Sequence, residues 1–135
     1  MITSTKNDLI TSLDTEIGYF EYYPNYVIGV MKEGVHVTFE NTSEPLQLGA
    51  EVYENSSGFT YISHRINSYS TDPSRYRESF ELFKNCKGVA IVNKHKKNIL
   101  LGLIEGIFTK LPLRTFNTIE QAIDWSNKLI KERAN

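Results

Sequence analysis

Residues 16–34 read EIGYFEYYPNYVIGVMKEG and carry the clearest structural signal in the chain. Tyr, Phe, Val and Ile dominate both halves of this segment, which is typical of β-strands. Pro24 and Asn25 separate the halves and favour a turn, and Gly34 ends the second half. We therefore predict two neighbouring strands that form a β-hairpin.

Helices and strands alternate after this hairpin. Residues 42–53 predict a helix, with Thr42 or Ser43 as its cap and Pro45 in its first turn. The run FTYISHRI, residues 59–66, predicts the third strand.

A second helix is predicted after the third strand. Asp72 would cap it, Pro73 would take its first position, and the sequence CKG at residues 86–88 would close it. VAIVN, residues 89–93, is a continuous apolar run of the kind that a covered strand needs. Residues 99–108 then predict a third helix that is apolar on most of its sides.

The C-terminal region predicts a last short strand at residues 112–116 and a closing helix. Thr118 and Gln121 form a capping box at the start of this helix. The order β-β-α-β-α-β-α-β-α indicates an α/β fold with one mixed, mostly parallel sheet and the hairpin at its antiparallel edge. We expect residues 1–16 to be an irregular lead-in, with room for a short helix over residues 8–13, and residues 17–135 to form a single domain.

The composition excludes several classes of protein. A net charge of −1 lacks the basic excess of a nucleic-acid-binding domain. The single Cys86 excludes an internal disulfide and favours a reducing compartment, and we expect it to be buried near the end of a helix. Residues 1–13 lack the apolar core of a signal peptide, and no apolar run approaches the ~20 residues of a membrane-spanning helix. We therefore expect a cytoplasmic protein with no transmembrane segment and no nucleic-acid partner.

Motifs for catalysis or metal binding are missing from the sequence. His36, His64 and His95 lie far apart, without the spacing of metal ligands. The sequence holds no nucleophile–base motif, glycine-rich phosphate loop or thiol pair. We expect no metal, no cofactor and no enzymatic activity.

Three segments carry a resemblance to a known fold: YVIGVMKEGV at residues 26–35, FTYISHRINSYSTDP at 59–73 and FNTIEQAIDW at 116–125. With the element order, they resemble the STAS-like fold of bacterial anti-sigma-factor antagonists, and more narrowly the small uncharacterised STAS-like proteins of Bacteroidetes-type bacteria. The resemblance covers about residues 17–130 and implies a regulatory module that acts through protein contacts. Antagonists of this type carry an Asp-Ser-Ser-Gly-type phosphorylation motif after the third strand, where this chain has NSYSTDP at 67–73.

The polar stretch after the third strand is the predicted recognition surface, because ligands of open α/β sheets meet the carboxyl ends of the strands. Hydroxyls, one cation and a helix start would suit an anionic group. Capping is the alternative: Asp72 would cap the next helix, and Ser68 and Ser70 would satisfy the amides of the turn. Ser68 and Ser70 are also the candidate phospho-acceptors. The predicted surface consists of Arg65, Asn67, Ser68, Tyr69, Ser70, Thr71 and Asp72.

Two apolar parts of the chain, the hairpin tyrosines and the predicted helix at 99–108, favour a homodimer or another protein contact. The alternatives are that the lead-in covers the hairpin tyrosines and that the helix at 99–108 is deeply packed. The candidate interface residues are Tyr19, Tyr22, Tyr23, Leu100, Ile104 and Phe108.

The fold also resembles the lipid-binding lobe of CRAL-TRIO proteins, which implies a carrier or sensor of a small apolar or lipid-like ligand. A small enzyme is the third alternative.

Overall fold

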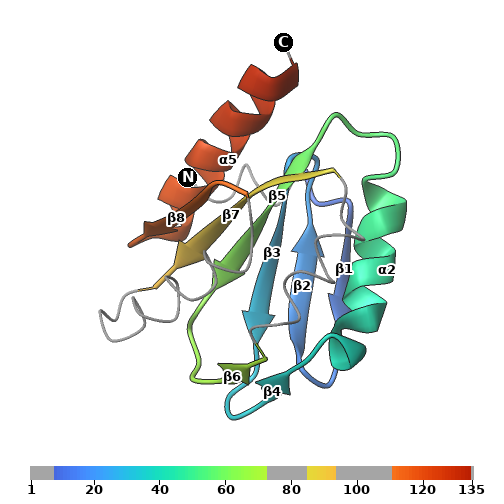
Figure 1. The fold of residues 1–135 in the computed structure, drawn as a ribbon, viewed down its shortest axis with the longest axis vertical. Helices are drawn as coiled ribbons and strands as arrows, with labels where there is room; N and C mark the ends of the chain where they lie inside the picture. Colours follow the sequence, from blue (N-terminus) through green and yellow to red (C-terminus); the bar gives the residue numbers. More distant parts are fainter. Residues whose placement is uncertain (1–7, 73–84, 94–110, 135) are drawn as a thin grey trace.

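The computed structural model describes residues 8–72, 85–93 and 111–134 (Figure 1). These residues form a six-stranded sheet in the order β1-β2-β3-β5-β7-β8 and a two-stranded sheet of β4 and β6. The described helices are the 3-10 helix η1 (Glu40–Thr42) and the α-helices α2 (Ser43–Val52) and α5 (Ile119–Ala134). The strands are β1 (Thr11–Asp14), β2 (Gly18–Tyr22), β3 (Tyr26–Met31), β4 (His36–Val37), β5 (Phe59–His64), β6 (Ser70–Thr71), β7 (Cys86–Val92) and β8 (Leu113–Phe116).

The predicted hairpin and the predicted mixed sheet are both confirmed. β2 and β3 are antiparallel, and the amide of Tyr23 donates to the carbonyl of Tyr26 across the turn at 2.8 Å. β3, β5, β7 and β8 then run parallel to one another. The fold is α/β, with antiparallel strands at only one side of the sheet.

The N-terminal region departs from the prediction. Residues 11–14 form β1, which pairs antiparallel with β2, so β1 rather than the hairpin is the edge of the sheet. The expected irregular chain or short helix is therefore wrong for these residues. The strand follows an alternation in which Leu13 packs against the core while Ser12 and Asp14 are exposed. One apolar residue in four gives too weak a pattern to be recognised in the sequence.

Strand boundaries differ at two further places. β5 ends at His64, two residues before the predicted end. β7 begins at Cys86, where the sequence predicted the end of a helix. The pairing of Phe59 with Cys86 extends β7 by three residues before the apolar run at 89–92. Residues 73–84 of the predicted helix at 73–88, and the whole predicted helix at 99–108, lie outside the described residues.

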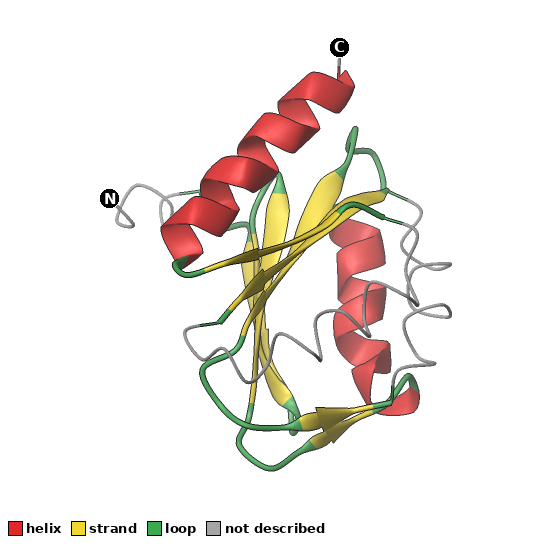
Figure 2. Ribbon diagram, turned by 60° about the vertical axis from the view of Figure 1, so that its left-hand side comes forward, coloured by secondary structure: helices red, strands yellow, loops and turns green. Residues whose placement is uncertain are grey.

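The two α-helices lie on opposite faces of the six-stranded sheet (Figure 2). On one face, Tyr53 at the end of α2 packs with residues of β2, β3, β5 and β7. On the other face, Ala122 of α5 packs with Ile28, Ile62 and Ala90 from three adjacent strands. Because Val27 and Ile28 belong to different clusters, the alternation along β3 divides the core into these two layers.

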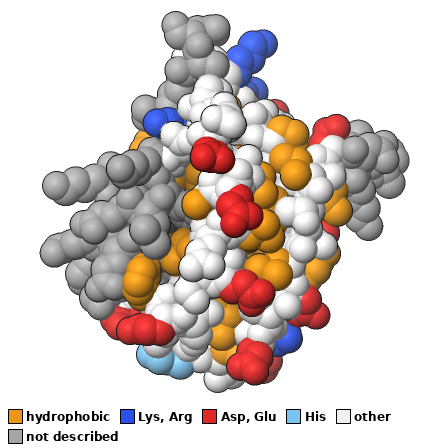
Figure 3. Space-filling model, turned by 90° about the vertical axis from the view of Figure 1, so that its right-hand side faces the viewer, with side chains coloured by type: hydrophobic (Ala, Val, Ile, Leu, Met, Phe, Trp, Pro, Cys, Tyr) orange, Lys and Arg blue, Asp and Glu red, His pale blue; other side chains and the backbone are white. Residues whose placement is uncertain are grey.

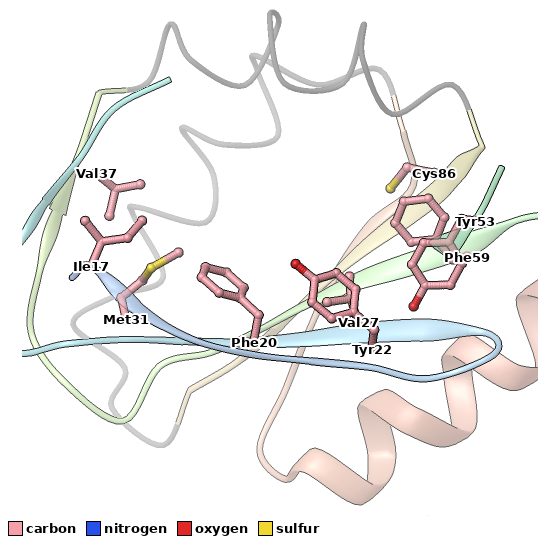
Figure 4. Packing of buried hydrophobic residues seen from close by; sticks show 9 residues of the cluster. All are labelled: Ile17, Phe20, Tyr22, Val27, Met31, Val37, Tyr53, Phe59 and Cys86. Carbon is pink, nitrogen blue, oxygen red and sulfur yellow. The ribbon is translucent and has the colours of Figure 1, made fainter. Parts of the chain in front are cut away.

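The α2 face is anchored by Tyr53 (Figure 4). Its ring stacks on Phe59 with the ring centroids 4.0 Å apart. Its hydroxyl lies 2.6 Å from the carbonyl oxygen of Tyr23 and 2.8 Å from that of Tyr26, and donates to these acceptors. One side chain therefore ties the end of α2 to the turn of the hairpin.

The predicted N-terminal cap is confirmed for α5, whereas Thr42 makes no side-chain cap bond to α2. The capping box of α5 is confirmed: the Gln121 side chain accepts from the amide of Thr118 at 3.3 Å, and the Thr118 hydroxyl accepts from the amide of Gln121 at 3.3 Å. Thr42 precedes α2 as predicted but makes no side-chain cap bond to it. The Thr42 hydroxyl instead donates to the carbonyls of Thr38 and Phe39, both at 2.9 Å, because η1 leads directly into α2.

Candidate functional site

The predicted recognition surface lies in a segment that we call the strap, residues 65–72, which follows the carboxyl end of β5. The strap runs beside residues 34–37, and β6 within it pairs in parallel with β4. The amide of Gly34 donates to the carbonyl of Ser68 at 2.7 Å, and the amide of Ser70 donates to that of Val35 at 3.0 Å. Figure 1 shows β4 and β6 side by side at one end of the large sheet.

Side chains add to this backbone ladder. The Asn67 amide group donates to the carbonyl of Met31 at 2.8 Å, and the amide of Ser68 donates to the carboxylate of Glu33 at 3.1 Å. The amide of Asp72 donates to the carbonyl of Val37 at 2.9 Å. Much of the strap's hydrogen bonding therefore holds it against the loop after β3. The capping alternative assigned the turn amides to the side chains of Ser68 and Ser70, whereas the Ser68 amide donates to Glu33 and the Ser70 amide donates to the carbonyl of Val35. The helix that Asp72 would cap lies outside the described residues.

Arg65 does not present its charge at the surface as the sequence suggested. The side chain is 5% exposed, its Nε donates to the Ser63 hydroxyl at 3.2 Å, and its guanidinium lies 5.5 Å from the centre of the Tyr69 ring. The Tyr69 hydroxyl is in turn 3.3 Å from that of Ser63. Ser63 and Arg65 are two residues apart in extended chain and so point to the same face, which is buried. Arg65 thus holds the start of the strap in place.

The exposed residues of the strap form its accessible surface. Ile66 is 63% exposed, the highest value among the large hydrophobic residues that the structure describes as exposed. Ser68 and Ser70 are also exposed, whereas Asn67, Tyr69, Thr71 and Asp72 are partly buried. Ile66 was missed because the sequence placed it inside the third strand, although the strand ends at His64.

A contact with His36 is the second feature that sequence reasoning missed. The Nδ1 atom of His36 lies 2.7 Å from the hydroxyl oxygen of Ser70, and both side chains are exposed. The pairing of β4 with β6 places these two residues opposite each other, although 34 residues separate them. An imidazole can accept the proton of a serine hydroxyl, so Ser70 has a base at hydrogen-bond distance. The sequence holds no local pattern that predicts this contact.

Buried groups of the core have raised pKa values. Burial raises the pKa of the Cys86 thiol to about 12. Burial also raises the pKa values of Tyr22 and Tyr53 above the ordinary value for tyrosine. The prediction that Cys86 is buried is confirmed, although it lies in β7 and not near the end of a helix. In the described ranges, no three His, Cys, Asp or Glu residues are placed to hold a metal ion.

The hairpin tyrosines of the predicted interface separate into two groups. Tyr19 is 39% exposed, and its hydroxyl donates to the Glu21 carboxylate at 3.3 Å. Tyr22 and Tyr23 are 1% and 2% exposed, because they pack into the two core layers, so their assignment to an interface is wrong. Leu100, Ile104 and Phe108 lie outside the described residues.

No family model matches the sequence, and the search of curated proteins finds no match. Among solved structures, the chain is similar to an uncharacterised protein of the DUF3478 family with a SpoIIAA-like fold from Shewanella loihica PV-4. The two chains are 14% identical, the alignment covers 86% of this chain and 90% of the other, and the TM-score is 0.55. No described helix has the length and apolar character needed to cross a membrane. The likeness in structure and the order of the strands show that this chain has the SpoIIAA-like, or STAS-like, fold.

Proposed function

We propose that the protein is a non-enzymatic, regulatory interaction module of STAS-like type, and that the strap is the surface with which it recognises a protein partner. The observation that carries this proposal is the exposure of Ile66, at 63%, within a segment that is otherwise held firmly. Arg65 on one side is buried, and Asn67 on the other donates to the carbonyl of Met31. An apolar side chain on a backbone that is already held in place binds a partner with less loss of conformational entropy than one on a mobile loop.

The polar neighbours of Ile66 supply the rim of this surface. Ser68 and Ser70 are exposed, and His36 adds an imidazole beside Ser70. An apolar centre with hydrogen-bonding groups around it matches the general composition of protein interfaces. The strap also follows the carboxyl end of a parallel strand, where open α/β sheets bind their ligands.

Ser70 is the better of the two candidate phospho-acceptors. Its hydroxyl oxygen lies 2.7 Å from the Nδ1 atom of His36, an imidazole nitrogen that can accept the hydroxyl proton. A phosphate on Ser70 would place a charged group next to the His36 imidazole. The fold would stay the same, and the surface seen by the partner would change its charge.

A pull-down from the source cell followed by mass spectrometry tests the proposal. The parent should recover a specific partner, and the double variant Ser68→Ala and Ser70→Ala should recover much less of it. Ser57→Ala is the matched control, because Ser57 is an exposed serine in the loop before β5 and should leave recovery unchanged. Equal recovery by all three proteins would remove the strap serines from the recognition surface.

The carrier alternative depends on the segment at 99–108, which lies outside the described residues. Native mass spectrometry of the purified protein separates the two functions. A retained lipid-like molecule would favour the carrier, whereas an unliganded mass together with a specific partner would favour the interaction module.

A further inference from the structure

The outer edge of β1 is a second surface that could bind a partner independently of the strap. β1 pairs with β2 on one side only, and no strand of residues 8–72, 85–93 or 111–134 pairs with its other side. Leu9 and Ile10, directly before β1, are 38% and 52% exposed. An open strand edge offers backbone donors and acceptors to another strand.

The alternation of hydrogen bonds along the β1–β2 ladder identifies the backbone amides and carbonyls of β1 that point away from β2. The amide of Thr15 donates to the carbonyl of Gly18 at 2.9 Å, which fixes the phase of the β1–β2 ladder. In an antiparallel pair every second residue turns its amide and carbonyl away from the partner strand. The backbone groups of Ser12 and Asp14 therefore point outward, and the side chains of both residues are exposed.

The part of the chain that contains this edge is strongly acidic. Residues 8–54 hold nine acidic residues and one basic residue, Lys32, which gives 9 − 1 = 8 net negative charges in a chain whose total is only −1. The ammonium of Lys32 already lies 3.4 Å from the Asp14 carboxylate. Figure 3 shows the side of the molecule that carries α2 and β1: acidic side chains are spread over it, with hydrophobic side chains between them.

We propose that the edge of β1 binds an extended, basic segment of a partner protein as an additional strand. Successive side chains of such a strand point to opposite faces of the sheet. Those on the face of Ser12 would lie near Glu21, the cross-strand neighbour of Ser12, and would be lysine or arginine. Those on the other face would continue the apolar surface of Leu13, which packs against the core. The expected ligand therefore alternates basic and apolar residues.

Charge also argues against a second copy of the chain at this edge. Two β1 strands paired about a two-fold axis would bring together two copies of Asp14, Glu16 and Glu21. Like charges on neighbouring strands destabilise a sheet, and a basic partner removes this repulsion.

Fluorescence anisotropy with labelled peptides tests the proposal on the full chain. The probe is a ten-residue peptide of alternating lysine and valine, and the two comparison peptides are an alternating glutamate–valine peptide and a peptide with the same lysines and valines in two blocks. The alternating lysine peptide should bind best, and its affinity should fall as salt is added, because ions screen exposed charges. Equal binding of the alternating and block peptides would overturn the proposal, since charge alone would then explain it.

Two proline variants separate the edge from general stability. Ser12→Pro removes an outward amide of β1, which an edge strand tolerates, and should weaken binding roughly tenfold, or about 1.4 kcal/mol. Thr115→Pro is the matched control on β8, the opposite edge of the sheet, and should bind as the parent does. If Ser12→Pro does not fold, Asp8→Lys with Glu16→Lys reverses the charges that flank β1 and should weaken binding to a similar extent. Parent-like affinity in a folded Ser12→Pro variant would contradict the proposal.

Hydrogen exchange followed by NMR gives a readout that only strand addition produces. The peptide should slow exchange of the Ser12 and Asp14 amides and leave that of the Thr115 amide unchanged. Unchanged exchange at Ser12 and Asp14 in the saturated complex would exclude strand addition. Self-association of the parent that Ser12→Pro abolishes would make a second copy the occupant and would also overturn the proposal.

Discussion

Tyr53 shows how a single residue fixes the geometry of the sheet on which the strap depends. It is 2% exposed, stacks on Phe59 and donates to carbonyls at both ends of the hairpin turn. The sequence placed Tyr53 at the end of the predicted helix at 42–53 but could not predict its hydrogen bonds, because the acceptors are backbone atoms of residues 27 and 30 positions away. The hydroxyl links the end of α2 to the hairpin, and the ring links it to β5.

Removing this hydroxyl tests the link. Tyr53→Phe keeps the ring and removes a buried hydroxyl that donates to two carbonyls, of which that of Tyr26 still accepts from the amide of Tyr23. We therefore expect the free energy of unfolding to fall by about 1–3 kcal/mol in urea denaturation. Tyr19→Phe is the control, because its hydroxyl is on an exposed side chain, and it should change the free energy of unfolding by less than ~0.5 kcal/mol. Equal effects of the two substitutions would show that the buried Tyr53 hydroxyl stabilises the fold no more than the exposed Tyr19 hydroxyl does.

Cys86 predicts a pH dependence of stability. Burial raises the pKa of its thiol from 9.0 to about 12 in the folded protein, so the unfolded chain loses this proton at a lower pH. The contribution to stability is complete below pH 9 and is lost as the pH rises towards 12. Urea denaturation at several pH values should show a less steep alkaline loss of stability in Cys86→Ala than in the parent. An identical pH dependence in Cys86→Ala and the parent would contradict a raised pKa of the Cys86 thiol in the folded protein.

At the scale of elements, helices and strands with strong local sequence patterns could be predicted, whereas those that depend on long-range strand pairing could not. The hairpin, β8 and the capping box of α5 follow from alternation, turn residues and side-chain spacing within a few positions. The first three residues of β7 read as a helix end because Lys87 and Gly88 suit one, and only pairing with β5 makes them a strand. β4 and β6 have two residues each, too few for any periodic signal.

The candidate site was predictable in place but not in detail. The sequence located the polar segment after the third strand correctly, because strand ends and the change to polar residues are local features. It gave Arg65 a surface role, since burial of a charged residue depends on what packs around it. It missed the contact between His36 and Ser70, which exists only after β4 and β6 pair.

The packing of α5 on β7 gives a prediction about Gly88. A Cβ atom there would lie 2.8 Å from the Leu129 side chain and 2.9 Å from that of Trp125. Gly88→Ala should therefore lower the free energy of unfolding by about 1–3 kcal/mol, the usual cost of overpacking. Lys87→Ala, on the neighbouring and only partly buried residue, should have a much smaller effect in thermal denaturation. A Gly88→Ala protein as stable as the parent would show that α5 moves away without loss.

At the scale of the whole molecule, the STAS-like fold places the strap at the carboxyl end of β5, between parallel neighbours β3 and β7. A likeness at 14% identity shows this fold and does not transfer a function. The proposed role therefore rests on the strap itself: Ile66 exposed, its flanking residues held, and Ser70 beside His36.

Assembly is a separate prediction at this scale. We expect a homodimer through Tyr19 or through the segment at 99–108, since Tyr22 and Tyr23 are buried. Light scattering at micromolar concentrations should give twice the mass of 15.5 kDa, and Tyr19→Ser should lower that mass if Tyr19 is in the contact. A monomer mass at every concentration tested would remove the hypothesis.

The role of the strap is tested most directly by the dissociation constant of the recovered partner, measured by titration calorimetry. Ile66→Ser should raise this constant at least about tenfold, because a central apolar contact of an interface contributes more than ~1 kcal/mol. Ala50→Ser is the matched control: Ala50 is an exposed apolar residue of α2, outside both the strap and the edge of β1, and its substitution should leave the constant unchanged. A folded Ile66→Ser protein that binds the partner as tightly as the parent would contradict the account.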